Sequence, residues 1–176
     1  MSLKGKRVAI LVEQDFEDIE LAQLLNAMRN ANAEVIMVGS GSRKVYRGLK
    51  GEVSVTVDIS ARKASGLEFD AVIVPGGYAA DKMRLYRSMV NLVKNAHLSG
   101  KIVGAVDRGP QLLISADIVK GRRVTSWPSV AVDLRNAGAN WVDETMVRDG
   151  NIITFGKPAD LSESNRVIIQ AIEENK

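Results

Sequence analysis

The sequence contains no cysteine. Without thiols the chain can form no disulfide, cannot bind zinc through thiolates and cannot use a sulfur nucleophile. The absence indicates no particular compartment, because a cysteine-free protein tolerates any redox environment. Several classes of structural and catalytic site are therefore excluded before any motif is considered.

Histidine is nearly absent as well, since His97 is the only one. It lies near Ser99 and Gly100 at the end of a predicted helix, where the helix dipole favours a cation, so we interpret it as a surface or capping residue. A Ser-His-Asp triad would have to use His97, and no serine occupies a strand-to-helix turn. A metal site needs several converging ligands, and the carboxylates show no such spacing, so we expect no metal.

Long apolar runs and phosphate-binding glycine loops are also missing. The run Val8–Val12 is too short for a signal peptide, and no stretch approaches the roughly 18 residues of a membrane span. We expect a cytoplasmic protein with no membrane partner. Gly39 and Gly41 lack the third glycine of a dinucleotide-binding turn, and no lysine-containing phosphate loop is present, so we expect no cofactor.

The charge is close to balanced, with a formal net charge of +3. Such a small excess is weak support for nucleic-acid binding. A local cluster of cations contains Arg43, Lys44, Arg47 and Lys50. No aromatic RNA-binding motif or recognition helix accompanies it, so we interpret it as a solvated loop and expect no nucleic-acid partner.

Short β-branched runs alternate with stretches of helical periodicity. The predicted strands are Arg7–Val12, Glu34–Val38, Val53–Val57, Ala71–Val74 and Ile102–Val106. The predicted helices are Phe16–Ala31, with Ile19 on its apolar face, Arg84–Leu98, and one that starts at Pro110. Repeated strand–helix units predict an α/β fold in which helices cover both faces of a mostly parallel sheet.

The pattern changes towards the C-terminus. Trp141–Val147 and Asn151–Phe155 flank the dipeptide Asp149-Gly150, which predicts an antiparallel hairpin at one edge of the sheet. Asp160 has the position of an N-cap, with Glu163 three residues later, before a last helix that runs through Ile172. The predicted sheet is therefore mixed.

Ligands of such sheets bind at the carboxyl ends of the strands, so three loops are candidates. The loop after Val12 is acidic, which the adjacent helix N-terminus alone would explain. The loop after Val74 contains Gly76 and Gly77, whose amides could hold an oxyanion or simply form a tight turn. The loop after Val106 begins with Asp107, which tolerates the positive φ of an abrupt turn and the field of a helix N-terminus.

Four motifs together resemble the ThiJ/PfpI superfamily, and most of all the PfpI-like intracellular proteases. They are Phe16-Glu17-Asp18-Ile19-Glu20, Pro75-Gly76-Gly77, the segment from Gly109 to Ala116, and Pro158-Ala159-Asp160-Leu161. The resemblance covers nearly the whole chain and implies one domain, residues 1–176. It also implies a flavodoxin-like three-layer α/β/α sandwich, related to class I glutamine amidotransferases, and a homodimer that can assemble into hexamers.

The resemblance also implies a site, which this chain alters. In the family a cysteine followed by a histidine occupies the strand-to-helix elbow, and here Asp107 and Arg108 stand at those places. The matching acidic residue of the first loop is Glu17. The oxyanion amides would be those of Gly76 and Gly77, and Asp81 matches an acid that reaches the elbow from a neighbouring subunit.

Family activities of the peptidase, deglycase and glyoxalase-like kinds depend on that cysteine, so we expect cysteine-dependent activity to be absent. One hypothesis is a pseudoenzyme or stress-related scaffold that binds a small carbonyl or carboxylate ligand. The alternative is a hydrolase or hydratase in which Asp107 and Glu17 act as nucleophile or as acid and base. Two carboxylates in one pocket should share a proton. Arg108 is expected to pair with Asp81 of a second copy.

Overall fold

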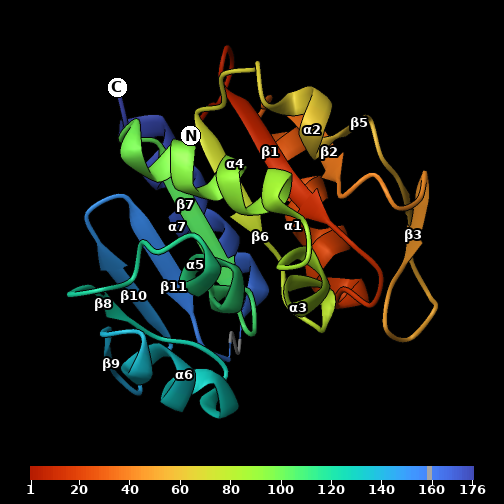
Figure 1. The fold of residues 1–176 in the computed structure, drawn as a ribbon. Coiled ribbons are helices and arrows are strands. Elements are labelled where there is room, and N and C mark those ends of the chain that lie inside the picture. Colours follow the sequence, from red (N-terminus) through yellow and green to blue (C-terminus); the bar gives the residue numbers. More distant parts are fainter. Residues whose placement is uncertain (158–159) are drawn as a thin grey trace.

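The computed structural model describes residues 1–157 and 160–176. Its main sheet has the strand order β10-β11-β7-β6-β1-β2-β5. The strands are β1 (Arg7–Val12), β2 (Glu34–Gly39), β5 (Ile59–Ser60), β6 (Ala71–Val74), β7 (Ile102–Val106), β10 (Met146–Asp149) and β11 (Ile152–Phe155). All neighbours in this sheet pair in parallel except β10 with β11. Figure 1 shows the sheet running from β10 on the left to β2 and β5 on the right.

Helices cover both faces of the sheet. The α-helices of the described residues are α1 (Asp18–Asn30), α2 (Ala61–Ala64), α3 (Ala79–Met83), α4 (Arg87–Leu98), α5 (Pro110–Ser115), α6 (Ala131–Asn136) and α7 (Leu161–Glu174). Helices α1 and α7 pack against each other, while α4 packs against α2 and α5. Figure 1 shows α4 and α5 in front of the sheet and α7 behind it. The predicted α/β fold with a three-layer arrangement is confirmed.

The central strands are apolar throughout because both of their faces are covered. All residues of β6 and β7 are buried, as are five of the six residues of β1. Such continuous apolar runs are typical of parallel strands between two helical layers. This packing fixes the positions of the loops that leave the carboxyl ends of β1, β6 and β7.

Several predicted boundaries were wrong. The segment Val53–Val57 gives only β4 (Ser54–Thr56), which pairs with β3 (Val45–Arg47) in a small separate hairpin. The segment Trp141–Val147 is divided, because Trp141 belongs to β9 (Asn140–Trp141), which pairs with β8 (Arg123–Val124). The pairing partner decided both boundaries: β4 pairs with the neighbouring β3, and β9 pairs with β8, which lies farther away in the sequence.

The helix predictions also needed correction at their starts. The first helix begins at Asp18, and Ile19 is 51% exposed although it was placed on the apolar face. The segment after Arg84 becomes helical only at Arg87, because Tyr86 has extended backbone angles (φ −113°, ψ 109°). Side-chain periodicity predicted both helices but could not locate these ends.

The C-terminal predictions are confirmed in outline. Strands β10 and β11 form the antiparallel hairpin, and Gly150 in its turn has a φ of 61°. Asp160 caps α7 by accepting hydrogen bonds from the backbone N–H groups of Ser162 and Glu163 (2.9 and 3.2 Å). The Glu163 carboxylate pairs with Arg166. Within the described residues, no helix has the length and apolar character needed to cross a membrane.

Candidate functional site

Asp107 occupies a strained turn between β7 and α5. Its φ is 59°, in the left-handed region that Asp tolerates better than most residues. Its backbone N–H donates to the carbonyl of Phe155 (2.9 Å), and its own carbonyl accepts from the N–H of Trp127 (2.8 Å). The next turn needs Gly109, because a Cβ there would lie 2.7 Å from the carbonyl oxygen of Val74. The chain thus forms the abrupt strand-to-helix elbow expected from the sequence.

The two glycine amides after β6 face side chains of this chain. The N–H of Gly77 donates to Oδ2 of Asp107 (3.1 Å), and the N–H of Gly76 donates to Oε1 of Glu20 (2.6 Å). A Cβ on Gly76 would lie 2.7 Å from the Cβ of Asp107 and 2.9 Å from the Glu20 carboxylate. Only glycine allows the two acidic side chains to approach the loop so closely. The expected oxyanion donors are therefore already bound to carboxyl groups.

Sequence reasoning missed Glu20 and chose Glu17. Glu17 lines the same cavity, and its backbone N–H donates to the carbonyl of Gly76 (3.3 Å). Among the described residues its carboxylate makes no hydrogen bond to Asp107, and it is the Glu20 carboxylate that reaches the glycine loop. The two glutamates are three residues apart and share one helix face, so helical spacing could have suggested either one.

The environment raises the pKa of both inner carboxyl groups. Burial raises the pKa of Glu20 to about 8, although the hydrogen bond from the Gly76 N–H acts to lower it. The negative charges of Asp107 and Glu17 raise it further. Burial also raises the pKa of Asp107, while the Gly77 N–H and Arg108 lower it. Glu20 therefore holds a proton at neutral pH.

Arg108 lies between two aromatic rings at the mouth of the site. Its guanidinium carbon is 4.9 Å from the ring centroid of Tyr78 and 5.0 Å from that of Trp127, and Nη1 is 3.7 Å from Oδ2 of Asp107. Lys157 also lies over Trp127, with Nζ 4.5 Å from the centroid. These stacked cations have the arrangement of cation–π pairs. Asp81 is exposed on α3, one turn of chain beyond Tyr78.

A cavity of about 360 Å³ opens next to these groups. It is lined by Glu17, Ile19, Glu20, Asp107, Arg108, Trp127, Lys157 and Leu161. Its lining combines acidic side chains, two cations and apolar side chains, which are the polar and apolar groups needed to orient a small ligand. It lies at the carboxyl ends of the strands, where ligands of such sheets bind.

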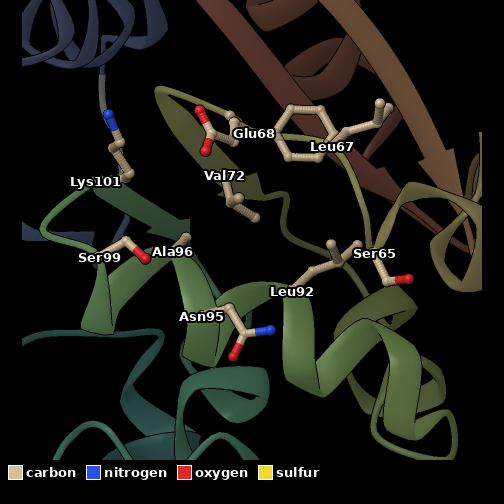
Figure 2. A pocket seen from close by; sticks show the side chains of 10 residues that line it. Ser65, Leu67, Glu68, Val72, Leu92, Asn95, Ala96, Ser99 and Lys101 are labelled. Atoms are coloured by element: carbon tan, nitrogen blue, oxygen red, sulfur yellow. The ribbon is translucent and has the colours of Figure 1, made fainter.

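A second cavity lies at the opposite end of the sheet. Its volume is about 250 Å³. Figure 2 shows the side chains around it, which come from the segment before β6, from β6, from α4 and from the segment between α4 and β7. Val72, Leu92 and Ala96 contribute apolar surface, while Glu68 and Lys101 lie at its edge. Lys101 pairs with Asp70 (3.8 Å). This cavity contains none of the side chains at the elbow, so the cavity next to Asp107 is the candidate functional site.

His97 is not part of the site. It lies in the last turn of α4, its carbonyl accepts from Asn151 (3.0 Å), and its buried Nδ1 makes no hydrogen bond with the described residues. Burial and the charge of Arg122 lower the pKa of His97, although its contact with Asn151 acts to raise it, so the imidazole is neutral at pH 7. Among residues 1–157 and 160–176, no three His, Cys, Asp or Glu side chains gather to hold a metal ion.

Comparison with known proteins identifies relatives along the whole chain. Protein/nucleic acid deglycase 2 of Escherichia coli is 38% identical over 169 residues, which cover 96% of this chain and 98% of that protein. A deglycase of Pyrococcus abyssi is 40% identical over 155 residues (88% of this chain, 92% of the relative). General stress protein 18 of Bacillus subtilis is 34% identical over 170 residues (96% and 99%).

Solved structures provide a second comparison. A two-domain protein of Anabaena variabilis, with DJ-1/ThiJ/PfpI-like and ferritin-like domains, superimposes with a TM-score of 0.91 at 40% identity. The match covers 96% of this chain but only 48% of that protein. DJ-1beta of Drosophila melanogaster shares the fold, with a TM-score of 0.86 at 24% identity, over 99% of this chain and 95% of that one. The model of the DJ-1/PfpI family matches residues 6–171, so this chain belongs to the DJ-1/PfpI family.

Proposed function

We propose that this protein is a DJ-1/PfpI family member that binds a small carboxylate-bearing ligand without covalent catalysis. In this proposal Asp107 and Arg108 replace the cysteine and histidine of the family elbow. The chain has no cysteine at all, so no thiolate can attack a carbonyl carbon. The deglycase activity in the names of its relatives would then not extend to this chain.

One observation carries the proposal: both amides that could stabilise an oxyanion already bind carboxyl groups of the chain. An oxyanion hole works when preorganised donors await the charge that develops in the transition state. Here Gly77 donates to Asp107 and Gly76 donates to Glu20. A carbonyl substrate would have to displace these groups before it could use either donor.

The cations at the mouth support a carboxylate as ligand. Arg108 and Lys157 both lie over Trp127 and border the cavity. A guanidinium recognises a carboxylate through charge-assisted hydrogen bonds, and the stacking rings limit the orientations that Arg108 can adopt. Ile19 and Leu161 would contact the apolar part of the ligand.

Binding assays and turnover assays together test the proposal. Purified protein should show no turnover of methylglyoxal, peptides or activated esters, and should bind pyruvate, which carries a carboxylate and a carbonyl. An Asp107→Cys/Arg108→His double variant should acquire turnover of methylglyoxal. Wild-type turnover that Asp107→Asn abolishes would overturn the proposal.

The raised pKa of Glu20 favours a second candidate, a hydrolase or hydratase. A carboxylic acid that keeps its proton at neutral pH can act as a general acid, and a neighbouring carboxylate can act as base or nucleophile. Glu20, with a pKa of about 8, would be the acid and Asp107 its partner, so Glu20 takes the role first given to Glu17. A pH–rate profile with a limb near the Glu20 pKa, lost in Glu20→Gln, would support this function.

We also propose that the protein forms homodimers, which can assemble into hexamers. Asp81 is exposed on α3, close in the chain to Tyr78, whose ring stacks on Arg108. The Asp81 carboxylate of a second copy could contact the guanidinium of Arg108, which remains partly accessible in the single chain. Asp81→Asn should weaken the dimer in analytical ultracentrifugation, and an unchanged association constant would exclude a role for this contact.

A further inference from the structure

A large basic cavity lies at the far edge of the sheet, away from the elbow. Its volume is about 850 Å³, and it lies between the loop after β2, the end of β4 and the start of α2. Its lining includes four cations, Arg43, Lys44, Arg62 and Lys63, together with Ser40, Ser42 and Ser60. Figure 1 shows β2, β5, α2 and β3 grouped on this side of the molecule.

The cavity is distinct from the site at Asp107. It begins where β2 and β5 end, since Gly39 pairs with Ser60 in the last register of these two strands. In the strand order, β2 is three positions from β7, and β5 is four. At about 4.8 Å per strand the two sites are roughly 15–20 Å apart.

The four cations are not neutralised by ion pairs with the described residues. All four are exposed, and none forms an ion pair with another described residue. One acidic residue, Asp58, also lines the cavity, and its Oδ2 already accepts a hydrogen bond from the backbone N–H of Met37 (2.8 Å). Four like charges around one hollow repel each other, and an anionic ligand would relieve that repulsion.

Buried polar groups hold the loop that carries Arg43. Glu13 is only 4% exposed and accepts hydrogen bonds from the hydroxyls of Ser40 and Ser42 (3.1 Å for Ser42 to Oε2). The hydroxyl of Tyr46 lies 3.0 Å from each serine oxygen and accepts the backbone N–H of Arg43 (3.1 Å).

A buried carboxylate without a cationic partner is costly to keep unless hydrogen bonds satisfy it, as they do here. The result is a basic loop with a fixed backbone. Preorganisation of this kind lowers the entropy cost of binding.

We propose that this cavity binds a small phosphorylated molecule, with the phosphate held by Arg43, Lys44, Arg62 and Lys63. Guanidinium, ammonium and hydroxyl groups are the donors that recognise phosphate oxygens. The volume exceeds the needs of inorganic phosphate, and Tyr86 lines the cavity with an aromatic surface for an organic part. A nucleic acid fits less well, because the cations surround one hollow and the net charge is only +3.

Titration calorimetry at low ionic strength tests the proposal with defined probes. The wild-type protein should bind AMP and pyrophosphate, and should not bind adenosine, which lacks the phosphate. Arg43→Ala/Lys63→Ala should weaken AMP binding about tenfold or more, because two charge-assisted contacts are lost. Arg29→Ala/Lys94→Ala, which removes two exposed cations from α1 and α4, should change AMP affinity less than about twofold.

Equal weakening by both double variants would overturn the proposal, since it would show a general effect of charge. Binding of a single-stranded oligonucleotide more tightly than AMP, with the same loss in both variants, would indicate a nucleic-acid surface and overturn it as well. Wild-type amide NMR gives a test that needs no variant. AMP should shift signals of Ser40–Lys44 and Ser60–Lys63, and shifts confined to Gly77 and Asp107 would place the ligand at the other site.

Discussion

Glu20 and Asp107 accept hydrogen bonds from the adjacent backbone amides of Gly76 and Gly77. This arrangement brings two acidic side chains from different elements, α1 and the elbow after β7, to one glycine loop. Burial of Glu20, helped by the negative charges of Asp107 and Glu17, raises its pKa to about 8, although the hydrogen bond from Gly76 acts to lower it. Both carboxyl groups also occupy the amide donors that a carbonyl substrate would need. The pair is therefore central to both proposed functions and to the stability of the site.

Replacing Glu20 by Gln should remove part of the pH dependence of folding. The pKa of Glu20 is about 8 in the folded protein, above its ordinary value of 4.5, so its stabilising effect is complete below pH 4.5 and is lost as the pH rises towards 8. The wild type should lose at most about 1.4 kcal/mol per pH unit more than Glu20→Gln in that window. Urea denaturation at a series of pH values measures this difference, and equal slopes would contradict the assignment.

Replacing Gly76 by Ala should destabilise the protein by about 1–3 kcal/mol, because the new Cβ would meet the Asp107 side chain at 2.7 Å. Gly66→Ala is the matched control, since a Cβ there meets nothing within 4 Å. Its stability should be unchanged or slightly raised. Thermal and urea denaturation would compare the two, and a loss in Gly66→Ala as large as in Gly76→Ala would count against the packing argument.

Replacing Asp18 by Ala should destabilise the protein by about 3 kcal/mol or more. Asp18 is fully buried and accepts the backbone N–H groups of Lys50, Glu52 and Val53 (2.8, 2.9 and 2.8 Å), which would lose their acceptor. Asp18→Asn should recover part of the loss. The exposed side chain of Glu52 offers a control, since Glu52→Ala keeps the backbone donor and should cost less than about 0.5 kcal/mol.

Asp18 also predicts how the stability of the protein changes at acid pH. Burial acts to raise the pKa of Asp18, but the backbone N–H groups outweigh it and hold the pKa below 3.8. A depressed pKa stabilises the folded state above the ordinary pKa, and the effect is lost as the pH falls through the folded value. The stability gap between wild type and Asp18→Asn should therefore narrow below about pH 4, which acid titration of both proteins can measure.

Replacing Arg108 by Ala should weaken pyruvate binding about tenfold or more, because the stacked guanidinium is the proposed carboxylate contact. Arg135→Ala is a close control, since Arg135 also lies 5.0 Å from a tryptophan ring, that of Trp141, outside the site. It should leave pyruvate affinity unchanged. Titration calorimetry of the wild type and both variants measures pyruvate affinity, and equal affinity in the two arginine variants would exclude the proposed contact.

The sequence by itself determined the fold class and much of the chemistry. Continuous apolar runs such as Ala71–Val74 require cover on both faces, which a parallel sheet between helices provides. The lack of cysteine removes thiol chemistry in any conformation. The turn at Asp107 was also predictable, because few residues other than Gly, Asn and Asp adopt positive φ next to a helix start.

The tertiary structure decided which groups meet. Glu17 and Glu20 share a helix face, and only the approach of the Gly76 loop to α1 selects Glu20 as the inner acid. The stacking of Arg108 between Tyr78 and Trp127 joins three separate loops. Local patterns fix backbone conformation, but pKa values and pockets arise from burial and from contacts between distant segments. For that reason the sequence could indicate the elbow, and only the folded chain could show that its donors are occupied.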